Sequence, residues 1–463
     1  MSRKSDLPAG PERPLSGRAK QLLQIDFLEH DPVEEALTPL ERLRGWCFEA
    51  LNGRGKIAGV VAAVRVADAF GEMTRDERDG FYAMLERHFS VEPTELDAAI
   101  EAYRGATGAR AAEIARMTQI LDSPRLRLFR QFNSVPSGIK FLVDLRADVD
   151  SRLKELPDLW LMEFELRHLL ESWFNIGFLE LERITWETPA ALLEKLVEYE
   201  AVHAIASWQD LKRRLQGDRA CYAFLHHSMP SEPVIFVEIA LVQGLSPRIQ
   251  DLIDPRSPGI EPQQADTAIF YSITNAQRGL RGIPFGNMLI KQVTARLRSE
   301  LPNLQTFATL SPIPRLRDEC IDPALEDGSI TAFYSDQEAA RVRELGDEDE
   351  LPAAVGALLK APGWHASTEV AEALRPGLLR AARAYLLERQ QRGRVACPVG
   401  HFHASNGAKL GRINWLGDTS KKGLAQSAGM MVNYLYEPAL FEEYQAEYTR
   451  TGRLPVDEVV QLL

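Results

Sequence analysis

The sequence predicts an α+β protein, in which an all-helical N-terminal domain is followed by an α/β domain. From about residue 38 to residue 174, apolar residues recur at spacings of three and four, which is the helical period. After Ile176 the pattern changes to short β-rich runs separated by turn residues. The length of 463 residues corresponds to about three domains of ~150 residues, and two larger domains fit equally well.

The helical half contains no alternating apolar–polar segment of the kind that forms a half-buried strand. Its helical spacing is clear at Phe81, Met84, Leu85 and His88. Gly and Pro residues punctuate this pattern and mark the turns between about seven or eight short helices. We therefore expect a helical domain over residues 21–170, followed by a second domain over residues 171–463.

The second half of the chain combines strands with helices. Two β-rich runs flank a Ser-Met-Pro-Ser-Glu-Pro turn, which predicts a hairpin. A later run leads through a Gly-bearing loop into an amphipathic helix and then into a further strand, an order that is typical of an α/β domain. The predicted elements are strands 221–227, 233–241 and 267–273, helix 285–300, strand 304–310 and helix 369–392.

Composition and charge exclude several classes of protein. The chain is 45% hydrophobic and 26% charged, which is ordinary for a globular protein. Its 54 Lys and Arg against 66 Asp and Glu leave a net charge of −12, which argues against a general nucleic-acid or anionic-membrane binder. A local basic pocket for a phosphorylated ligand is compatible with this charge.

No segment predicts a membrane span or an export signal. The longest apolar stretches, such as residues 233–242, fall short of the ~20 residues that a bilayer crossing needs. Residues 1–20 are polar, so we expect a flexible arm rather than a secretory signal, and Asp6 and Glu12 argue against a transit peptide. Scattered cysteines without metal-ligand spacing predict reduced thiols in a cytoplasmic protein and no zinc site: Cys47, Cys221, Cys320 and Cys397.

Residues 275–286 (NAQRGLRGIPFG) form the loop that leads from a predicted strand into a predicted helix. Gly279, Gly282 and Gly286 remove side chains where the backbone has to approach another group closely. The unpaired N–H groups at the helix start, together with Arg278 and Arg281, suit an anion such as a pyrophosphate. A β–α turn without a ligand is the alternative, because G-x-x-G-x-x-x-G differs from the dinucleotide fingerprint.

Other polar residues of this half have ordinary structural interpretations. Ser311 is followed by a proline, where a serine is most often a cap or a turn hydroxyl. His403 has a competitor in His401, which would point to the opposite side of an extended segment. Asn406 and the glycine after it form a turn signal by default. The residues alone leave the choice between the two histidines open.

Four blocks carry a family resemblance through their combination and order. They are YSITNAQRGLRGIPFGNMLIKQ at 271–292, LSPIP at 310–314, CPVGHFHASNGAKLGRINW at 397–415 and residues 418–436, with further similarity at 172–183, 199–203 and 232–242. The strand, glycine-bearing loop and helix resemble the acyl-CoA site of GNAT-type acetyltransferases, and the blocks together resemble the malonyl-CoA decarboxylase family. This resemblance implies a GNAT-like α/β catalytic domain behind a helical oligomerisation domain.

The resemblance also implies roles for individual residues. The serine of the family's L-S-P-[IV]-P block falls on Ser311, and the catalytic histidine of its F-H-x-x-N-G block falls on His403. Tyr436, in the tail motif NYLY, is expected to line the acyl pocket. Residues 315–317, Arg-Leu-Arg, stand where the family usually has Gly-Phe. The family's CoA-phosphate loop falls on Gln277, Arg278, Gly279, Leu280, Arg281, Gly282 and Ile283.

The activity that the resemblance implies is the conversion of malonyl-CoA to acetyl-CoA and CO2 by a carboxy-lyase. Breaking the bond to the carboxylate leaves an enolate, whose charge on the thioester oxygen needs positioned hydrogen-bond donors. The carboxylate must also be held out of the plane of the thioester carbonyl. A hydroxyl and an imidazole suffice for orientation and for protonating the carbanion. Because the thioester accepts the electrons, we expect neither a metal nor an organic cofactor.

The expected partner is malonyl-CoA, without nucleic acid or membrane, and the resemblance implies a homo-oligomer such as a tetramer built from dimers. Two alternatives stay open. An acyl-CoA-dependent N-acyltransferase on the same scaffold would need a general base and an open acceptor channel. A non-catalytic malonyl-CoA-binding sensor would keep the phosphate loop but tolerate the loss of His403. The pairing of Ser311 with His403 favours the decarboxylase over the transferase.

Overall fold

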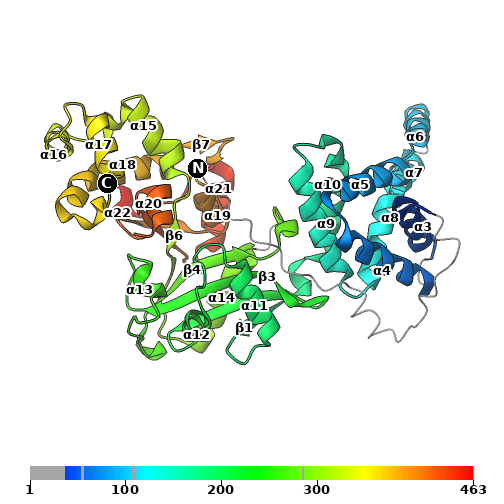
Figure 1. Cartoon of the computed structure of the whole chain (residues 1–463), viewed down its shortest axis with the longest axis horizontal. Helices are drawn as coiled ribbons and strands as arrows, with labels where there is room; N and C mark the ends of the chain where they lie inside the picture. Colours follow the sequence, from blue (N-terminus) through cyan, green and yellow to red (C-terminus); the bar gives the residue numbers. More distant parts are fainter. Residues whose placement is uncertain (1–36, 54–56, 107, 109, 284–285, 462–463) are drawn as a thin grey trace. The chain divides into compact units, whose positions relative to one another are not determined.

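The structure is a computed structural model that describes residues 37–53, 57–106, 108, 110–283 and 286–461. The arm expected at residues 1–20 lies outside these ranges. The chain divides into two compact units (Figure 1). The first comprises the chain up to Leu179 together with His226–Pro230 and Gln277–Ile283, and the second comprises Glu180–Leu225, Ser231–Ala276 and the chain from Pro284 onward.

This division differs from the expected domain boundary after residue 170 in two ways. The first unit continues to Leu179. It also includes the glycine-bearing loop Gln277–Ile283, which the sequence placed in the catalytic domain. The physical reason is packing, because this loop contacts a helix of the first unit, as described below.

The first unit is helical, as predicted, and its helices begin at recognisable caps. Thr38 and Thr74 each accept a hydrogen bond from the N–H of the glutamate three residues later, whose carboxylate bonds back to the cap. None of the helices in the described ranges is long and apolar enough to cross a membrane. The elements are α3 (Pro39–Asn52), α4 (Ile57–Glu72), α5 (Arg75–Phe89), α6 (Pro93–Gly105), α7 (Arg110–Leu121), α8 (Pro124–Gln131), η1 (Phe132–Ser134), α9 (Gly138–Arg152), η2 (Pro157–Leu159), α10 (Trp160–Trp173), η3 (Ile176–Phe178) and, from the inserted loop, η5 (Arg278–Leu280).

Aromatic side chains and buried ion pairs, such as that of Arg125, hold these helices together. The ring of Phe70 on α4 lies 5.7 Å from that of Phe81 on α5 and 5.6 Å from that of Phe141 on α9. Arg125 at the start of α8 is fully buried and donates to Glu165 on α10 at 2.6 Å. A buried cation is tolerated here because a carboxylate pairs with it.

The second unit is built on an eight-stranded sheet with the order β1-β2-β3-β4-β5-β10-β6, and β9 also pairs with β10. β4 and β5 are parallel and are joined by the crossover helix α14, as the predicted β–loop–helix–β order requires. The strands are β1 (Leu179–Ile184), β2 (Arg219–His226), β3 (Met229–Val242), β4 (Thr267–Asn275), β5 (Thr306–Thr309), β6 (Ser311–Pro312), β9 (Lys409–Asn414) and β10 (Met431–Leu435), with β7 (Gln390–Gln391) and β8 (Arg394–Val395) in a separate pair.

The helices of the second unit include several that the sequence analysis did not predict, among them α11, α12, α16 and α17. The predicted helices 285–300 and 369–392 correspond to α14 and α18. The helical elements are α11 (Ala190–Tyr199), α12 (Trp208–Arg214), α13 (Gln250–Ile253), η4 (Pro262–Gln264), α14 (Gly286–Glu300), η6 (Arg317–Ile321), α15 (Asp322–Glu326), η7 (Ser329–Phe333), α16 (Asp336–Gly346), α17 (Leu351–Lys360), η8 (Trp364–Ala366), α18 (Thr368–Leu387), α19 (Pro398–Ser405), α20 (Lys421–Ser427), α21 (Phe441–Thr451) and α22 (Glu458–Gln461).

The predicted hairpin of β2 and β3 is present, but its turn is shorter than predicted. β2 ends at His226 and β3 begins at Met229, so Pro230 and Pro233 lie inside a strand and not in the turn. Proline is accepted in a strand where the ladder does not need its missing N–H. The prolines therefore mark the start of a long strand rather than the loop itself.

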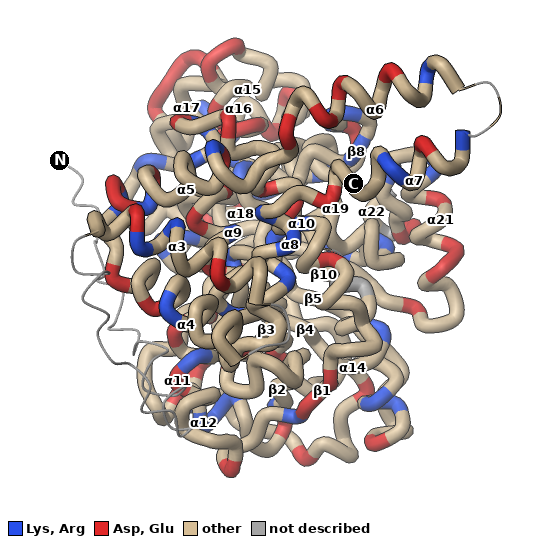
Figure 2. Tube along the Cα trace, turned by 90° about the vertical axis from the view of Figure 1, so that its right-hand side faces the viewer, with Lys and Arg blue, Asp and Glu red and all other residues tan. Residues whose placement is uncertain are grey.

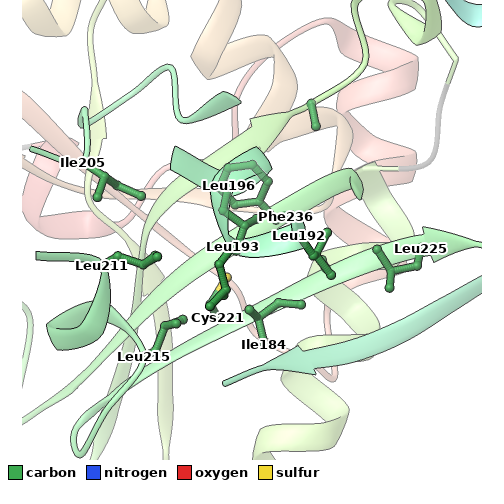
Figure 3. Close-up of a cluster of buried hydrophobic side chains, with 12 residues drawn as sticks. Ile184, Leu192, Leu193, Leu196, Ile205, Leu211, Leu215, Cys221, Leu225 and Phe236 are labelled. Atoms are coloured by element: carbon green, nitrogen blue, oxygen red, sulfur yellow. The ribbon is translucent and has the colours of Figure 1, made fainter. Parts of the chain in front are cut away.

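A cluster of buried apolar side chains, many of them leucines, lies on the first three strands of the sheet (Figure 3). Side chains of α11 and α12 pack onto the first three strands, and the amphipathic spacing of the leucines on α11 explains why this helix lies flat on the sheet. Cys221 belongs to this core, where burial raises the pKa of its thiol. The labelled cluster contains Ile184, Leu192, Leu193, Leu196, Ile205, Leu211, Leu215, Cys221, Leu225 and Phe236.

Candidate active site

The structure brings three predicted residues, Ser311, His403 and Tyr436, into one hydrogen-bonded group. The Nε2 atom of His403 lies 2.9 Å from the Oγ of Ser311, and its Nδ1 atom lies 2.8 Å from the hydroxyl oxygen of Tyr436. These residues are 6%, 3% and 2% exposed for Ser311, His403 and Tyr436 respectively, and all belong to the second unit. The imidazole therefore bridges two hydroxyl groups, an arrangement that can pass a proton.

Ser311 is positioned where the pairing of β10 with its neighbour is interrupted. β10 pairs with β5 and with β6 in one antiparallel register. Between them, side chains replace the backbone ladder: the Oγ1 of Thr309 accepts from the N–H of Tyr434 at 3.2 Å, and the Nδ2 of Asn433 donates to the carbonyl oxygen of Thr309 at 2.7 Å. The Oγ of Ser311 in turn donates to the Oγ1 of Thr309 at 2.9 Å. These side-chain hydrogen bonds hold the Ser311 hydroxyl next to His403.

His403 comes from the short helix α19, which begins at the cap residue Cys397 and carries a proline in its first turn. The comparison of the two histidines assumed an extended segment, but the segment is helical. Positions two apart on a helix are separated by about 200°, so the two side chains still point in different directions. The Nδ1 of His401 lies 2.6 Å from the hydroxyl of Tyr448. The structure thus joins Ser311 to His403 and not to His401.

The group is electrically neutral at physiological pH. Burial lowers the pKa of the His403 imidazole to about 3, and burial raises the pKa of the Tyr436 hydroxyl well above its ordinary value. The ring of Tyr434 stacks on the imidazole at a centroid distance of 4.5 Å. Because Ser311 donates to Thr309, the consistent tautomer has Nε2–H donating to Ser311 and Nδ1 accepting from Tyr436.

One buried polar residue next to this group, Asn406, was interpreted only as a turn residue. It is 1% exposed, and neither the nitrogen nor the oxygen of its amide has a hydrogen-bond partner within the residues that the structure describes. Its side chain lies near Tyr436, where a hydrogen-bonding interaction opposes the effect of burial on the pKa of that hydroxyl, although no contact of the amide meets full hydrogen-bond geometry. A buried polar group without a partner is costly unless a ligand meets it. The signal was available, because Asn406 is the asparagine of the F-H-x-x-N-G block.

The seven residues expected to bind CoA phosphates form a turn in the first unit, whereas Ser311 and His403 lie in the second. Arg278, Arg281 and Gly282 are exposed, and the other residues of the turn are buried. A Cβ atom on Gly279 would lie 1.7 Å from the carbonyl oxygen of Val143 on α9. This glycine is therefore required by the close packing of its backbone against α9. Gly282 has φ +83°, a conformation that glycine adopts without strain.

The departure at residues 315–317 leaves the local turn intact. Arg315 has φ +64°, in the left-handed region that glycine populates freely. Leu316 is completely buried, and the guanidinium of Arg317 pairs with Asp322 at 2.8 Å. The backbone at Arg315 thus has the conformation that a glycine would favour, and the arginine holds it at a cost in strain.

A second buried polar cluster is structural. Arg214 on α12 donates to Asp210, to Glu238 on β3 at 2.8 Å and to the carbonyl oxygen of His203, so it joins a helix and a loop to the sheet. No group of three or more His, Cys, Asp or Glu side chains suited to a metal ion occurs among the residues described by the structure.

Taken together, the fold and the site define an enzyme with an α/β unit that follows a helical unit along the chain and contains a buried, neutral serine–histidine–tyrosine group. A family model described as the malonyl-CoA decarboxylase C-terminal domain matches residues 177–463, and one described as the N-terminal domain matches residues 89–174. The chain belongs to the malonyl-CoA decarboxylase family and is a carboxy-lyase.

Relatives of known name and structure agree with this assignment. The mitochondrial malonyl-CoA decarboxylase of Anser anser anser is 38% identical over 350 residues, which cover 73% of this chain and 69% of that protein. The Rattus norvegicus enzyme is 38% identical and the match covers 68% of this chain and 65% of that protein, so this chain spans about two thirds of the length of these relatives. Crystal structures of malonyl-CoA decarboxylase from Rhodopseudomonas palustris and Agrobacterium vitis each superpose with a TM-score of 0.81 at 36% identity; the first covers 92% of this chain and 100% of its own, the second 91% and 98%.

Proposed function

We propose that this protein decarboxylates malonyl-CoA to acetyl-CoA and CO2, with Ser311, His403 and Tyr436 as its acid–base group. The observation that carries this proposal is the hydrogen-bonded chain through the His403 imidazole, with contacts of 2.9 and 2.8 Å, in a member of the malonyl-CoA decarboxylase family. The family supplies the substrate, and the geometry supplies a route for the proton that the reaction consumes.

The chemistry needs orientation and charge stabilisation before it needs a proton. When the bond between the carboxylate and the methylene carbon breaks, CO2 leaves and the electron pair moves into the thioester, which becomes an enolate. Positioned donors must stabilise the negative charge on the thioester oxygen. We assign this task to Asn406, whose buried amide has no partner among the described residues, together with the hydroxyl of Ser311.

The second step puts one proton on the enolate carbon. In this proposal the Ser311 hydroxyl gives up its proton and takes one from Nε2 of His403, while Nδ1 takes the hydroxyl proton of Tyr436. Solvent protonates the Tyr436 oxygen in the same step, so each turnover consumes one proton. Burial disfavours both an imidazolium and a tyrosinate, so the protons move together and no charged intermediate forms on the relay.

Recognition of CoA is assigned to the turn Gln277–Ile283. Arg278 and Arg281 are exposed there, and guanidinium groups bind phosphates strongly. Tyr436 is proposed to line the acyl pocket through its ring, in addition to its hydroxyl contact with His403. No cofactor is proposed, because the thioester itself accepts the electrons.

Site variants test the assignment. Ser311→Ala and His403→Gln are each expected to lower kcat by about a hundredfold or more, because each removes one member of the relay. The dissociation constant for CoA, measured by titration calorimetry, should stay within about twofold of the wild-type value. His401→Gln is the matched control, since its imidazole contacts Tyr448 and not Ser311. An inactive His401→Gln beside an active His403→Gln would refute the assignment.

The two alternative functions make different predictions in the same assay. An N-acyltransferase would consume malonyl-CoA only when an amine acceptor is added. A malonyl-CoA sensor would bind the ligand without turnover, and the loss of His403 would leave its response unchanged. The cytoplasmic location and the homo-oligomeric state also remain proposals, and the animal relatives carry the word mitochondrial in their names.

A further inference from the structure

The helical unit holds the turn Gln277–Ile283 by a buried guanidinium. Arg146 on α9 donates through Nη1 to the carbonyl oxygen of Gly279 at 2.6 Å and to that of Arg281 at 3.0 Å. Its Nε and Nη2 atoms donate to Glu163 on α10, at 3.1 and 2.7 Å. The Arg146 side chain is 6% exposed and that of Glu163 is 11% exposed. All of these residues belong to the first unit.

These contacts complete the hydrogen bonding of the carbonyl groups of the turn. The carbonyl oxygens of Gln277, Arg278 and Leu280 accept hydrogen bonds from N–H groups within the turn itself. Those of Gly279 and Arg281 accept from Arg146. Every carbonyl from residue 277 to residue 281 therefore has a partner on the protein side. Carbonyl oxygens carry partial negative charge, and a hydrogen-bond donor at each of them reduces the repulsion that a nearby phosphate would otherwise meet.

The same packing leaves the cationic side chains of the turn outside. Arg278 and Arg281 are exposed, whereas Gly279 lies against Val143 of α9 so closely that a Cβ atom would be 1.7 Å from the Val143 carbonyl oxygen. Glu163 neutralises the charge of Arg146 and fixes the plane of its guanidinium group. The turn is thus preorganised from behind, which lowers the cost of ordering it around a ligand.

We infer that Arg146, oriented by Glu163, is a positioning residue for CoA, so that the helical unit sets CoA affinity in addition to any role in assembly. The inference rests on the proposed assignment of Gln277–Ile283 as the CoA-phosphate turn. It implies that a chain without its helical half should bind CoA more weakly than the full-length protein.

The test compares Arg146→Gln with Arg152→Gln in the full-length protein. Arg152 lies on the same helix, is 3% exposed and pairs with Asp79 at 2.6 Å, but it does not contact the turn. We expect Arg146→Gln to raise the CoA dissociation constant and the KM for malonyl-CoA by about tenfold or more, with kcat changed less than about threefold. Arg146→Lys should restore part of the affinity, because one ammonium group can bond one carbonyl oxygen. Arg152→Gln should leave the dissociation constant within about twofold.

The outcomes separate this inference from the function on which it rests. If Arg278→Ala and Arg281→Ala weaken CoA binding while Arg146→Gln does not, the turn is the CoA site and the inference is overturned. If none of the three changes CoA binding, the assignment of the turn fails as well. Equal losses in Arg146→Gln and Arg152→Gln would mean general destabilisation, which also overturns the inference. Should Arg146→Gln not fold, Gly279→Ala displaces the turn from α9 through the Val143 carbonyl oxygen instead, and CoA affinity within about twofold of wild type would count against a role of this packing in CoA binding.

Discussion

His403 owes its properties to the residues packed around it. Its imidazole lies between the hydroxyls of Ser311 and Tyr436 and under the ring of Tyr434, with 3% of the residue exposed. Burial without a neighbouring carboxylate explains why the pKa of His403 falls to about 3. A neutral imidazole has one N–H to donate and one nitrogen that can accept, so it can relay a proton between two hydroxyls.

This neutrality gives a prediction for the pH dependence of stability. The unfolded chain has an ordinary imidazole, which binds a proton below pH ~6.5, whereas the folded His403 stays neutral until pH about 3. Stability from this residue is therefore fully present above pH ~6.5 and is lost progressively as the pH falls toward the folded pKa. The free energy of unfolding, measured by denaturant titration, should fall less steeply below pH ~6.5 in His403→Gln than in wild type. Identical slopes would contradict the pKa assignment.

Much of the site could be predicted from sequence at this scale, but not all of its contacts. Ser311 and His403 were singled out by the blocks that contain them, and their 2.9 Å contact brings together residues far apart in the chain. The proposed role of Asn406 was missed, although the residue lies in the F-H-x-x-N-G block, because an Asn-Gly pair is dominated by its turn preference. In the structure, the burial of its unpaired amide distinguishes Asn406 from an ordinary turn residue.

At the scale of elements, the β5–β6–β10 region positions the serine through an interrupted ladder. Asn433 stands in for the missing backbone bonds by donating to the carbonyl oxygens of Thr309 and Ser246 and accepting from Asn414. The sequence predicted a single strand over residues 304–310, and the structure stops β5 at Thr309. Hydropathy cannot locate such an opening, because the residues around it remain apolar and buried.

The turn after β6 offers a test of strain at one residue. Arg315 has φ +64°, so Arg315→Gly should raise the free energy of unfolding by up to about 1 kcal/mol, as measured by urea titration. The matched control is Arg298→Gly within α14, which should lower that free energy by up to about 1 kcal/mol because glycine weakens a helix. A destabilised Arg315→Gly protein would show that the arginine side chain contributes more than its backbone costs.

Some helices were not predicted although the sequence contains signals for them. α16 and α17 flank the acidic run 347–350, which forms the connection between the two helices. Ser335 forms a capping box with Glu338 at the start of α16, a signal that the sequence contains. α11 has amphipathic leucines and α12 contributes Leu211, and both helices pack these residues onto the sheet.

At the scale of the whole molecule, charge is spread rather than concentrated. Figure 2 shows Lys and Arg interspersed with Asp and Glu along the trace in both units. The net charge of −12 is therefore compatible with the local cationic turn at Arg278 and Arg281. The assignment of that turn to the helical unit could not be predicted from sequence, because it depends on contacts between residues more than 130 positions apart, such as Arg146 and Gly279.

Assembly is a prediction at this scale. We expect the intact protein to form a homo-oligomer, with contacts from the helical unit, whose exposed apolar side chains include Trp160 at 61% and Phe164 at 45%. Light scattering coupled to size exclusion should give a mass that is a multiple of 51.9 kDa across micromolar concentrations. A mass of one chain throughout that range would contradict the assembly, and would leave the reaction assigned to Ser311 and His403 unaffected.

The central claim is that this chain removes CO2 from malonyl-CoA by itself and protonates the resulting enolate through Ser311 and His403. The most direct measurement incubates the purified protein with malonyl-CoA in D2O, without amine acceptor or added cofactor, and follows both products by mass spectrometry. The account predicts equimolar CO2 and acetyl-CoA carrying one deuterium, with the rate about a hundredfold or more lower in Ser311→Ala. Intact malonyl-CoA that is consumed only after an amine is added would contradict it.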